Sequence, residues 1–146
     1  MIFGLPSTGK TTYLTKLALD ALKKGEYEGL KIDRVYTNWA INHPNIYQLH
    51  WDKLGYEQYE NALILIDEIS AYCDNRNWKE NLEHQKLMFF KLYRHYRLQI
   101  IYCSQSWDDC DKKIRNLTDQ FYMIESLPFG FSKITQISMF HLHSGT

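Results

Sequence analysis

The first residues of the chain have the spacing of a phosphate-binding loop. The pattern G-x-x-x-x-G-K-[ST] is satisfied in full by Gly4, Leu5, Pro6, Ser7, Thr8, Gly9, Lys10 and Thr11. In such a loop, backbone N–H groups surround a phosphate, glycines allow the close approach, and the following helix points its positive end at the anion. Lys10 would reach the β- and γ-phosphates, and the Thr11 hydroxyl would bind Mg²⁺. We assign Thr12 to the same nucleotide site, and we expect Lys10 to have no partner within the loop itself.

A pair of acids follows a strongly apolar run. The run Leu63-Ile64-Leu65-Ile66 precedes Asp67 and Glu68, and ligands of open α/β sheets bind at the carboxyl ends of the strands. Asp67 would hold Mg²⁺ through its water shell, and Glu68 can polarise the attacking water as a general base. Because metal binding needs only Asp67, Glu68 favours hydrolysis over binding alone. The alternative role for Glu68 is a salt-bridged strand cap.

Gln105 follows another apolar run and is a candidate sensor. An amide at the end of a strand can hydrogen-bond both a γ-phosphate and the attacking water. Without the other motifs, Gln105 would be an ordinary polar residue leaving a strand. No guanine-reading N-K-x-D sequence is present, which disfavours a GTPase of the Ras type.

The elements that must position these residues alternate between short apolar runs and longer periodic ones, which predicts an α/β fold with a mostly parallel sheet flanked by helices. We expect strands at residues 1–3, 33–37, 63–67, 99–104 and 121–125, an edge strand or hairpin at 131–139, and helices at 10–24, 80–97 and 108–118. Gly25 is placed to end the first helix. Three residues are short for a central strand, so the first strand is either unusually brief or preceded by further residues. Turn residues interrupt the segment 38–61, which has no clear periodicity.

Composition limits the classes of protein that remain. The 146 residues suffice for a single domain, 45% are hydrophobic and 23% charged, and 17 basic side chains balance 17 acidic ones. These values argue against a disordered chain and against a globally basic nucleic-acid binder. The longest apolar run, residues 62–66, is far below the roughly 18 residues of a membrane helix, and no secretory signal opens the chain. Cys73, Cys103 and Cys110 lack metal spacing and are expected to be reduced thiols in a cytosolic protein.

A basic and aromatic segment precedes the strand of Gln105. It has no acid between residues 84 and 107 and contains Lys86, Phe89, Phe90, Lys91, Tyr93, Arg94, Tyr96 and Arg97. The simplest interpretation is an amphipathic helix with its aromatic side chains inward and its basic side chains in water. It can also be a groove for single-stranded DNA, or a subunit interface that offers an arginine to a neighbour's γ-phosphate. For such a finger we rank Arg94 first, Arg97 second and Arg115 third.

In the order of its motifs, the chain resembles the zonula occludens toxin (Zot) family. The resemblance rests on the phosphate loop, then Val35-Tyr36-Thr37-Asn38, then Leu65-Ile66-Asp67-Glu68, then the sequence RHYRLQIIYCSQ at residues 94–105. It covers nearly the whole chain. Members of this family are P-loop assembly proteins of filamentous phages, placed in the FtsK–HerA superfamily of additional-strand ATPases.

The resemblance implies a P-loop NTPase sheet in which the sensor strand is inserted between the phosphate-loop strand and the acidic strand. It also implies ATP and Mg²⁺ as ligands, and a homo-oligomeric ring or multimer in the cytoplasm at the inner face of the host membrane. Single-stranded phage DNA and inner-membrane assembly proteins would be its partners. The sequence departs from the family in two respects: its 146 residues include no membrane-spanning helix or outer domain, and Ser7 stands where many members carry glycine.

Several functions fit these residues. The favoured one is a Mg²⁺-dependent ATPase of the Zot-like type, resembling the cytoplasmic motor domain for filamentous phage assembly and extrusion. The alternatives are a DNA-translocating or packaging ATPase of the FtsK–HerA type, a nucleotide-binding scaffold without turnover, and a small P-loop kinase. Glu68 and Gln105 favour hydrolysis over a scaffold. A kinase would need an acceptor pocket and a basic lid, for which only Lys112-Lys113-x-Arg115 offers a hint.

Overall fold

Seven strands form one sheet in the order β5-β4-β6-β7-β1-β8-β9. In chain order these are β1 (Ile2–Phe3), β4 (Arg34–Thr37), β5 (Ile46–Gln48), β6 (Ala62–Ile66), β7 (Leu98–Ser104), β8 (Phe121–Ser126) and β9 (Ser132–Ile137). Neighbours pair in parallel except β9, which is antiparallel to β8. The computed structural model describes residues 1–5, 8–72, 84–110 and 112–137, without the side chains of residues 84, 85 and 94. The sheet confirms the predicted α/β class and the insertion of β7 between β6 and β1.

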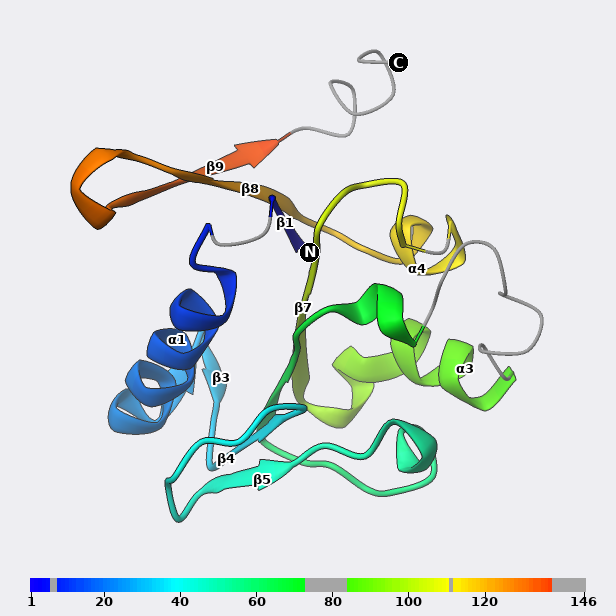
Figure 1. Cartoon of the computed structure of the whole chain (residues 1–146). Coiled ribbons are helices and arrows are strands. Elements are labelled where there is room, and N and C mark those ends of the chain that lie inside the picture. The colour runs from blue at the N-terminus through cyan, green and yellow to red at the C-terminus, as the bar shows by residue number, and fades with distance from the viewer. Residues whose placement is uncertain (6–7, 73–83, 111, 138–146) are drawn as a thin grey trace.

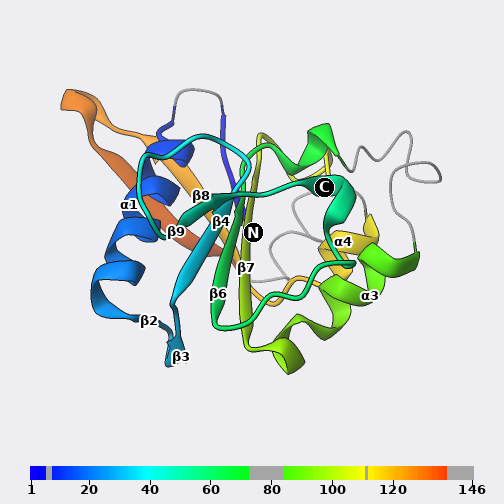
Figure 2. The same ribbon diagram turned by 90° about the horizontal axis from the view of Figure 1, so that it is seen from below.

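Helices cover both faces of this sheet (Figure 1). On one face lies α1 (Lys10–Lys24), and on the other lie α3 (His84–Leu92) and α4 (Lys112–Asn116), an arrangement that is also clear in the turned view of Figure 2. All five residues of β6 are buried. Leu63 and Leu65 pack in the core under α1, and Ile64 and Ile66 in the core under α3 and α4. This burial on both faces explains why β6 is a continuous apolar run.

The first helix agrees with its sequence. It spans Lys10–Lys24 and ends at Gly25, whose φ of 73° is left-handed and whose N–H donates to the Ala21 carbonyl. The other two expected helices are shorter in the structure. From residue 84 onward, α3 is followed by the 3-10 helix η3 (Tyr93–Tyr96), and residues 80–83 lie outside the described part. The helix α4 ends at Asn116 in a tightened turn, where the Leu117 N–H donates to the Ile114 carbonyl and the Thr118 N–H to the Arg115 carbonyl, both at 3.1 Å.

The segment 38–61, which has no periodicity, contains β5 and the 3-10 helix η1 (Trp51–Lys53). A small antiparallel hairpin of β2 (Glu26–Tyr27) and β3 (Leu30–Lys31), which we did not predict, lies after α1. A third 3-10 helix, η2 (Ile69–Ala71), follows the acidic pair. These elements are too short for hydrophobic periodicity to reveal them.

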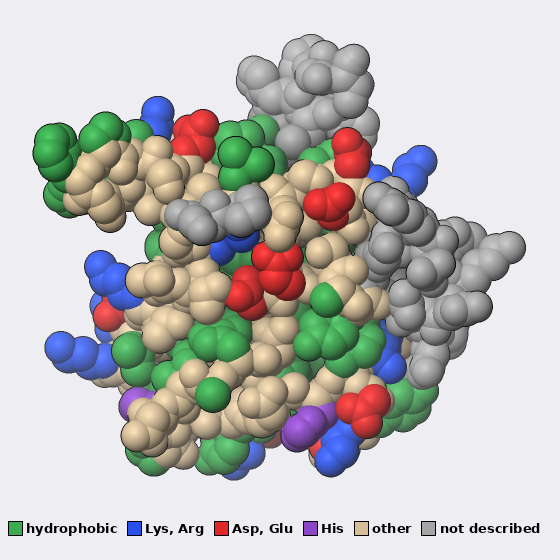
Figure 3. Space-filling model, viewed as in Figure 1, with side chains coloured by type: hydrophobic (Ala, Val, Ile, Leu, Met, Phe, Trp, Pro, Cys, Tyr) green, Lys and Arg blue, Asp and Glu red, His purple; other side chains and the backbone are tan. Residues whose placement is uncertain are grey.

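The hairpin β8–β9 projects from the body of the molecule (Figure 1). It confirms the edge strand or hairpin expected at 131–139, of which residues 138 and 139 lie outside the described part. The tip contains the 3-10 helix η4 (Pro128–Gly130), and its side chains include Phe129, 97% exposed, and Phe131, 68% exposed. Figure 3 shows this hydrophobic group at the end of the hairpin. An apolar group of this kind on a projecting tip is typical of a contact surface.

Two further observations bear on the sequence. None of the helices within the described ranges is long and apolar enough to cross a bilayer. Cys103 and Cys110 are buried thiols, and burial raises the pKa of the Cys103 thiol, which keeps it protonated and unreactive. Cys73 lies outside the described residues.

We predict that Gly4→Ala destabilises the protein more than Gly29→Ala does. A Cβ on Gly4 would lie 2.4 Å from the Ile124 carbonyl oxygen of β8, so backbone must move, and such overpacking costs roughly 3 kcal/mol. A Cβ on Gly29 meets nothing within 4 Å, and only its φ of 79° is unfavourable, at roughly 1 kcal/mol. Urea unfolding without nucleotide measures both. Equal losses of stability would show that β8 accommodates the methyl group and that the close fit is unimportant.

Candidate functional site: a phosphate loop facing an acidic strand end

The phosphate loop joins β1 to α1 at the carboxyl edge of the parallel strands (Figure 1). Residues 4, 5 and 8–12 are described, whereas Pro6 and Ser7 lie outside the described residues. Gly9 has a φ of 89° immediately before the first residue of α1, a conformation that favours glycine. The Gly4 N–H donates to the Ser104 carbonyl of β7 at 3.2 Å. The strand, loop and helix therefore follow one another as a phosphate loop requires.

Lys10 is buried inside this loop, with 6% of its surface exposed. Its Nζ donates to the Gly4 carbonyl at 2.7 Å and to the Leu5 carbonyl at 2.9 Å. The expectation that Lys10 has no partner within the loop is therefore wrong. The Gly4 and Leu5 carbonyl oxygens therefore accept the ammonium hydrogen bonds that phosphate oxygens would accept in a nucleotide complex. A bound phosphate must compete with these carbonyl oxygens for the ammonium. Without a phosphate, the two hydrogen bonds of Lys10 stabilise the loop.

The hairpin β8–β9 supports the loop from a distant part of the chain. The Ser132 hydroxyl donates to the Thr8 carbonyl at 2.9 Å across 124 positions of sequence. The Thr8 hydroxyl in turn donates to the Leu5 carbonyl at 2.9 Å. Ser132 was missed by the sequence analysis because no local pattern marks a partner so far away. These bonds fix the loop's shape on both sides of residues 6 and 7.

The two predicted metal ligands meet directly. The Thr11 hydroxyl donates to Asp67 Oδ2 at 2.5 Å, although Thr11 begins α1 and Asp67 follows β6. Within the described ranges, the buried Oδ1 of Asp67 has no hydrogen-bond partner. A buried carboxylate oxygen costs free energy unless something charged or polar satisfies it. One carboxylate and one hydroxyl beside a phosphate loop form the set of protein oxygens that Mg²⁺ takes, so these residues fit that ion.

Asn38 holds the backbone of Asp67. Its side-chain amide donates to the Asp67 carbonyl at 2.8 Å, and its amide oxygen accepts from the Asp67 N–H at 2.7 Å. Thr37, the last residue of β4, pairs with Leu65 in β6, so the residues that follow these strands meet at the same edge. In the sequence, Asn38 stood out only as part of the motif behind the family resemblance. Its place as the first residue after a predicted strand was the signal that could have revealed it.

Glu68 has a left-handed backbone, with φ 51° and ψ 56°. A residue with a side chain pays about 1 kcal/mol or more for this conformation, which is enriched at functional sites but also occurs in this chain at Glu28, Asn61, Arg97 and Phe129. Its carbonyl accepts the Ala71 N–H of η2 at 2.9 Å. In the part of the chain that the structure describes, no ion pair reaches its carboxylate, so nothing there supports a salt-bridged cap. The general-base role stays a prediction.

Gln105 is exposed and follows β7 directly. Because β7 lies between β6 and β1, Gln105 leaves the sheet between the strand that ends in Asp67 and the strand that leads into the phosphate loop. The hydroxyl of the preceding Ser104 donates to the Ser106 carbonyl at 3.1 Å and turns the chain at this point. This placement is the one a sensor needs, and the role stays a prediction.

Two of the three candidate arginines lie far from the loop. Arg94 is in η3, and Arg97 directly precedes β7, so both are at the amino edge of the sheet. The length of β7 puts them roughly 20 Å from the carboxyl edge, too far for either to serve its own loop. Arg97 forms an exposed ion pair with Glu60 at 3.9 Å. The side chain of Arg94 lies outside what the structure describes.

Arg115, the third candidate, is engaged within its own chain. Its guanidinium lies 4.8 Å from the Trp107 ring centre and pairs with Asp108 at 3.7 Å. The side chain is 11% exposed, and its buried Nε has no hydrogen-bond partner within the described ranges. An arginine stacked and paired in this way is poorly placed to reach another subunit.

The basic helix differs from its amphipathic expectation. Phe89 and Phe90 are buried as expected, but Lys86, expected on the water side, is 3% exposed. Its Nζ lies 5.9 Å from the Trp51 ring centre and 5.6 Å from that of Tyr56, and such cation–π contacts offset part of the cost of burial. The reason is tertiary: η1 and the turn after it cover this side of α3. Lys86 is therefore unavailable to follow a DNA backbone.

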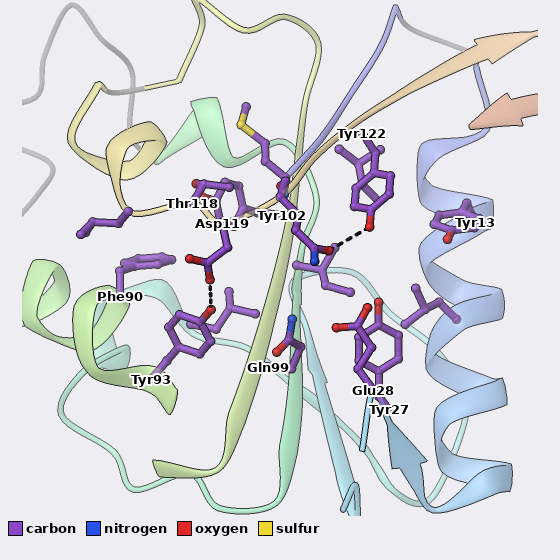
Figure 4. A pocket seen from close by; sticks show the side chains of 17 residues that line it. Tyr13, Tyr27, Glu28, Phe90, Tyr93, Gln99, Tyr102, Thr118, Asp119 and Tyr122 are labelled. Carbon is purple, nitrogen blue, oxygen red and sulfur yellow. Dashed lines mark hydrogen bonds between the residues drawn. The ribbon is translucent and has the colours of Figure 1, made fainter. Parts of the chain in front are cut away.

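A separate cavity of about 310 Å³ lies at the opposite edge of the sheet (Figure 4). It is found beyond the amino end of β1, because Ile2 pairs with Cys103 and β7 extends further than β1 does. Tyr93 donates to Asp119 at 2.8 Å on one side of it. Tyr27, whose pKa is raised by burial, lines the other side. None of the described residues of the phosphate loop lines this cavity, which is separate from the candidate nucleotide site.

The sheet order, the phosphate loop and the acidic strand end together define a P-loop NTPase fold of the additional-strand type. A family profile described as zonular occludens toxin (Zot) matches residues 1–145. The chain belongs to the Zot family. Among curated protein sequences, none matches it.

Solved structures show the same fold. The N-terminal domain of zonular occludens toxin from Neisseria meningitidis superposes with a TM-score of 0.70 at 20% identity, over 93% of this chain and 81% of that one. The genome packaging NTPase of Sulfolobus turreted icosahedral virus 2, in complex with ATPγS, superposes with a TM-score of 0.61 at 15% identity, over 88% of this chain and 76% of that one. At such identities the likeness establishes the fold and leaves the chemistry to the residues.

We predict that Lys10→Ala destabilises the nucleotide-free protein. The substitution leaves the Gly4 and Leu5 carbonyls without their donor, at a cost of about 2 kcal/mol, and we expect nucleotide affinity measured by calorimetry to fall as well. Lys23→Ala, an exposed position in the same helix, is the matched control. If the two variants unfold at the same urea concentration, the hydrogen bonds of Lys10 within the loop contribute nothing to stability.

Proposed function

We propose that this chain is a Mg²⁺-dependent ATPase. The observation that carries the proposal is the meeting of Thr11 and Asp67, at 2.5 Å, beside a complete phosphate loop. The viral packaging NTPase with the same fold has been described in complex with ATPγS, AMPPCP and AMP, which supports nucleotide binding by this chain. The hydrolytic step is inferred from Glu68 and Gln105.

The residues divide the work by position. The N–H groups of the loop and the positive end of α1 would bind the phosphates. Lys10 would exchange the Gly4 and Leu5 carbonyls for β- and γ-phosphate oxygens. Thr11 and Asp67 would hold Mg²⁺, which when bound neutralises charge on the phosphate oxygens. Glu68, one residue beyond Asp67, would accept a proton from the attacking water, and Gln105 would orient that water from the end of β7.

The larger role that we propose is that of a motor for filamentous phage assembly, acting as a homo-oligomer at the inner face of the host membrane with single-stranded DNA and membrane assembly proteins as partners. Membership in the Zot family supports this role. The second candidate is a DNA-packaging ATPase, which is favoured by the fold shared with a viral genome packaging NTPase. Turnover with and without single-stranded and double-stranded DNA separates the two, since each role predicts stimulation by a different strand form.

We predict that Glu68→Gln binds Mg²⁺·ATP as the wild type does but hydrolyses it at least 10²-fold more slowly, because it loses the general base and keeps Asp67 and Thr11. Phosphate release and nucleotide binding are measured on the same sample. Glu26→Gln is the control, because Glu26 is an exposed acid in β2, beyond the end of α1 that is remote from the loop. Undiminished turnover would assign Glu68 a structural role and require another residue to activate water.

We also predict that turnover depends on association between copies. Arg94 cannot reach its own loop, so as a finger it must act on a neighbour, where such a residue is worth roughly 10³–10⁵ in rate. Arg94→Ala and Lys10→Ala should each be inactive, and mixing them should restore part of the activity by pairing an intact arginine with an intact loop. Lys23→Ala mixed with Lys10→Ala controls for dilution. Full activity of the wild type at concentrations where sedimentation finds only monomer would contradict a shared site.

A further inference from the structure

The segment Thr37, Asn38 and Trp39 touches both sides of the proposed metal site. Asn38 forms its two hydrogen bonds with the backbone of Asp67, at 2.8 Å and 2.7 Å. Because the N–H and the carbonyl of Asp67 are both hydrogen-bonded to Asn38, the backbone of Asp67 is restricted in rotation and in movement along the strand direction. The contact fixes the point from which the Asp67 carboxylate projects.

The neighbouring residue reaches the other ligand. The Trp39 indole N–H donates to the Thr15 hydroxyl at 3.2 Å, and that hydroxyl donates to the Thr11 carbonyl at 2.8 Å. Thr11 is thereby connected to the segment after β4 through one intermediate side chain. The Thr37 hydroxyl donates to the Trp39 carbonyl at 2.7 Å, which holds the turn in which Asn38 and Trp39 diverge.

We propose that Asn38 and Trp39 are positioning residues that set the spacing between Thr11 and Asp67 for the metal ion. This inference rests on the proposed Mg²⁺-dependent function. The Thr11 hydroxyl and Asp67 Oδ2 are already 2.5 Å apart, so a metal ion must enter by separating or sharing them. Because Asn38 and Trp39 hold Asp67 and Thr11 from a single turn, they limit how far these two residues move apart when the metal ion binds.

The nature of the two contacts favours positioning over simple packing. Asn38 is half-buried, and its amide satisfies a backbone donor and a backbone acceptor of one particular residue. The Oδ1 atom of that residue, Asp67, is buried and, within the described ranges, has no hydrogen-bond partner. With one oxygen held only by a threonine and the other by nothing described, the carboxylate depends on its backbone for orientation. Groups that orient a ligand in this way typically contribute 10–100-fold to metal affinity.

The test compares Asn38→Ala and Trp39→Phe with Tyr72→Phe. Asn38→Ala removes both contacts with Asp67, and Trp39→Phe keeps an aromatic ring but removes the indole donor. Tyr72→Phe is the matched control, since within the described ranges the hydrogen bond that it removes is the weak 3.4 Å contact of Asn38 with the Tyr72 hydroxyl. Each protein is titrated with a fluorescent ATP analogue in EDTA and at increasing Mg²⁺, and Mn²⁺ bound with ATP is counted by electron paramagnetic resonance.

We expect the Mg²⁺ concentration at half-saturation to rise roughly tenfold for Asn38→Ala and roughly threefold for Trp39→Phe, the effect of losing one neutral hydrogen bond. Nucleotide affinity in EDTA should stay unchanged, as should every value for Tyr72→Phe. If Asn38→Ala fails to fold, Trp39→Phe still decides the matter.

Other results would contradict one or more of these proposals. If nucleotide binding by the wild type depends on Mg²⁺ and both variants show the same Mg²⁺ dependence, the positioning role is overturned and the proposed function is not. An equal loss of affinity with and without Mg²⁺ would show that the segment only supports the fold. A wild-type protein whose nucleotide binding ignores Mg²⁺ would overturn the proposed function together with this inference, whereas Mg²⁺-dependent binding without turnover would overturn only hydrolysis.

Discussion

The contact between Thr11 and Asp67 joins two parts of the chain whose strands are not neighbours. Thr11 follows the loop after β1, Asp67 follows β6, and β7 lies between those strands. For the hydroxyl and the carboxylate to meet at 2.5 Å, the chain after β1 and the chain after β6 must converge across the end of β7. Whatever residue leaves β7 is therefore confined near both. In this chain that residue is Gln105, so its suitability as a sensor is a consequence of strand order.

Two kinds of contact hold the phosphate loop in shape: the hydrogen bonds of Lys10, which a phosphate would replace, and contacts with β8 and β9. The Lys10 ammonium is the replaceable group, since its carbonyl partners sit where phosphate oxygens would compete. The hydrogen bond from Ser132 to the Thr8 carbonyl and the close fit of Gly4 on β8 do not involve the Lys10 ammonium. A loop shaped in advance loses little conformational entropy on binding. Because displacing Lys10 costs two charge-assisted hydrogen bonds, a highly charged anion such as a triphosphate competes for it better than a weakly charged one.

Local pattern was sufficient for the elements that carry the main motifs. The apolar spacing over residues 10–24, with Gly25 after it, predicted α1 with its correct limits, and the unbroken apolar run before Asp67 predicted a doubly buried strand. The insertion of β7 came from the family resemblance instead. Strand order depends on which strands pair over long sequence separations, and no periodicity encodes it. Helix α4 was overestimated because its last turn closes by i→i+3 hydrogen bonds of Leu117 and Thr118, which no apolar pattern encodes.

The residues that sequence reasoning missed are those whose partners are distant. Lys86 is buried because Trp51 and Tyr56, at least thirty positions earlier, cover its side of the helix. Asn38 is a different case from Lys86. Gln105 was found because it directly follows a strand, and Asn38 directly follows a strand as well. Residues that follow neighbouring parallel strands meet at one edge, and β4 neighbours β6 just as β7 does. Once a strand is recognised at 33–37, its first polar follower becomes a candidate for the same site as Asp67. Applied to every predicted strand, that rule would have made Asn38 a candidate from the sequence, whereas the pairing of β4 with β6 that puts it beside Asp67 comes from the structure.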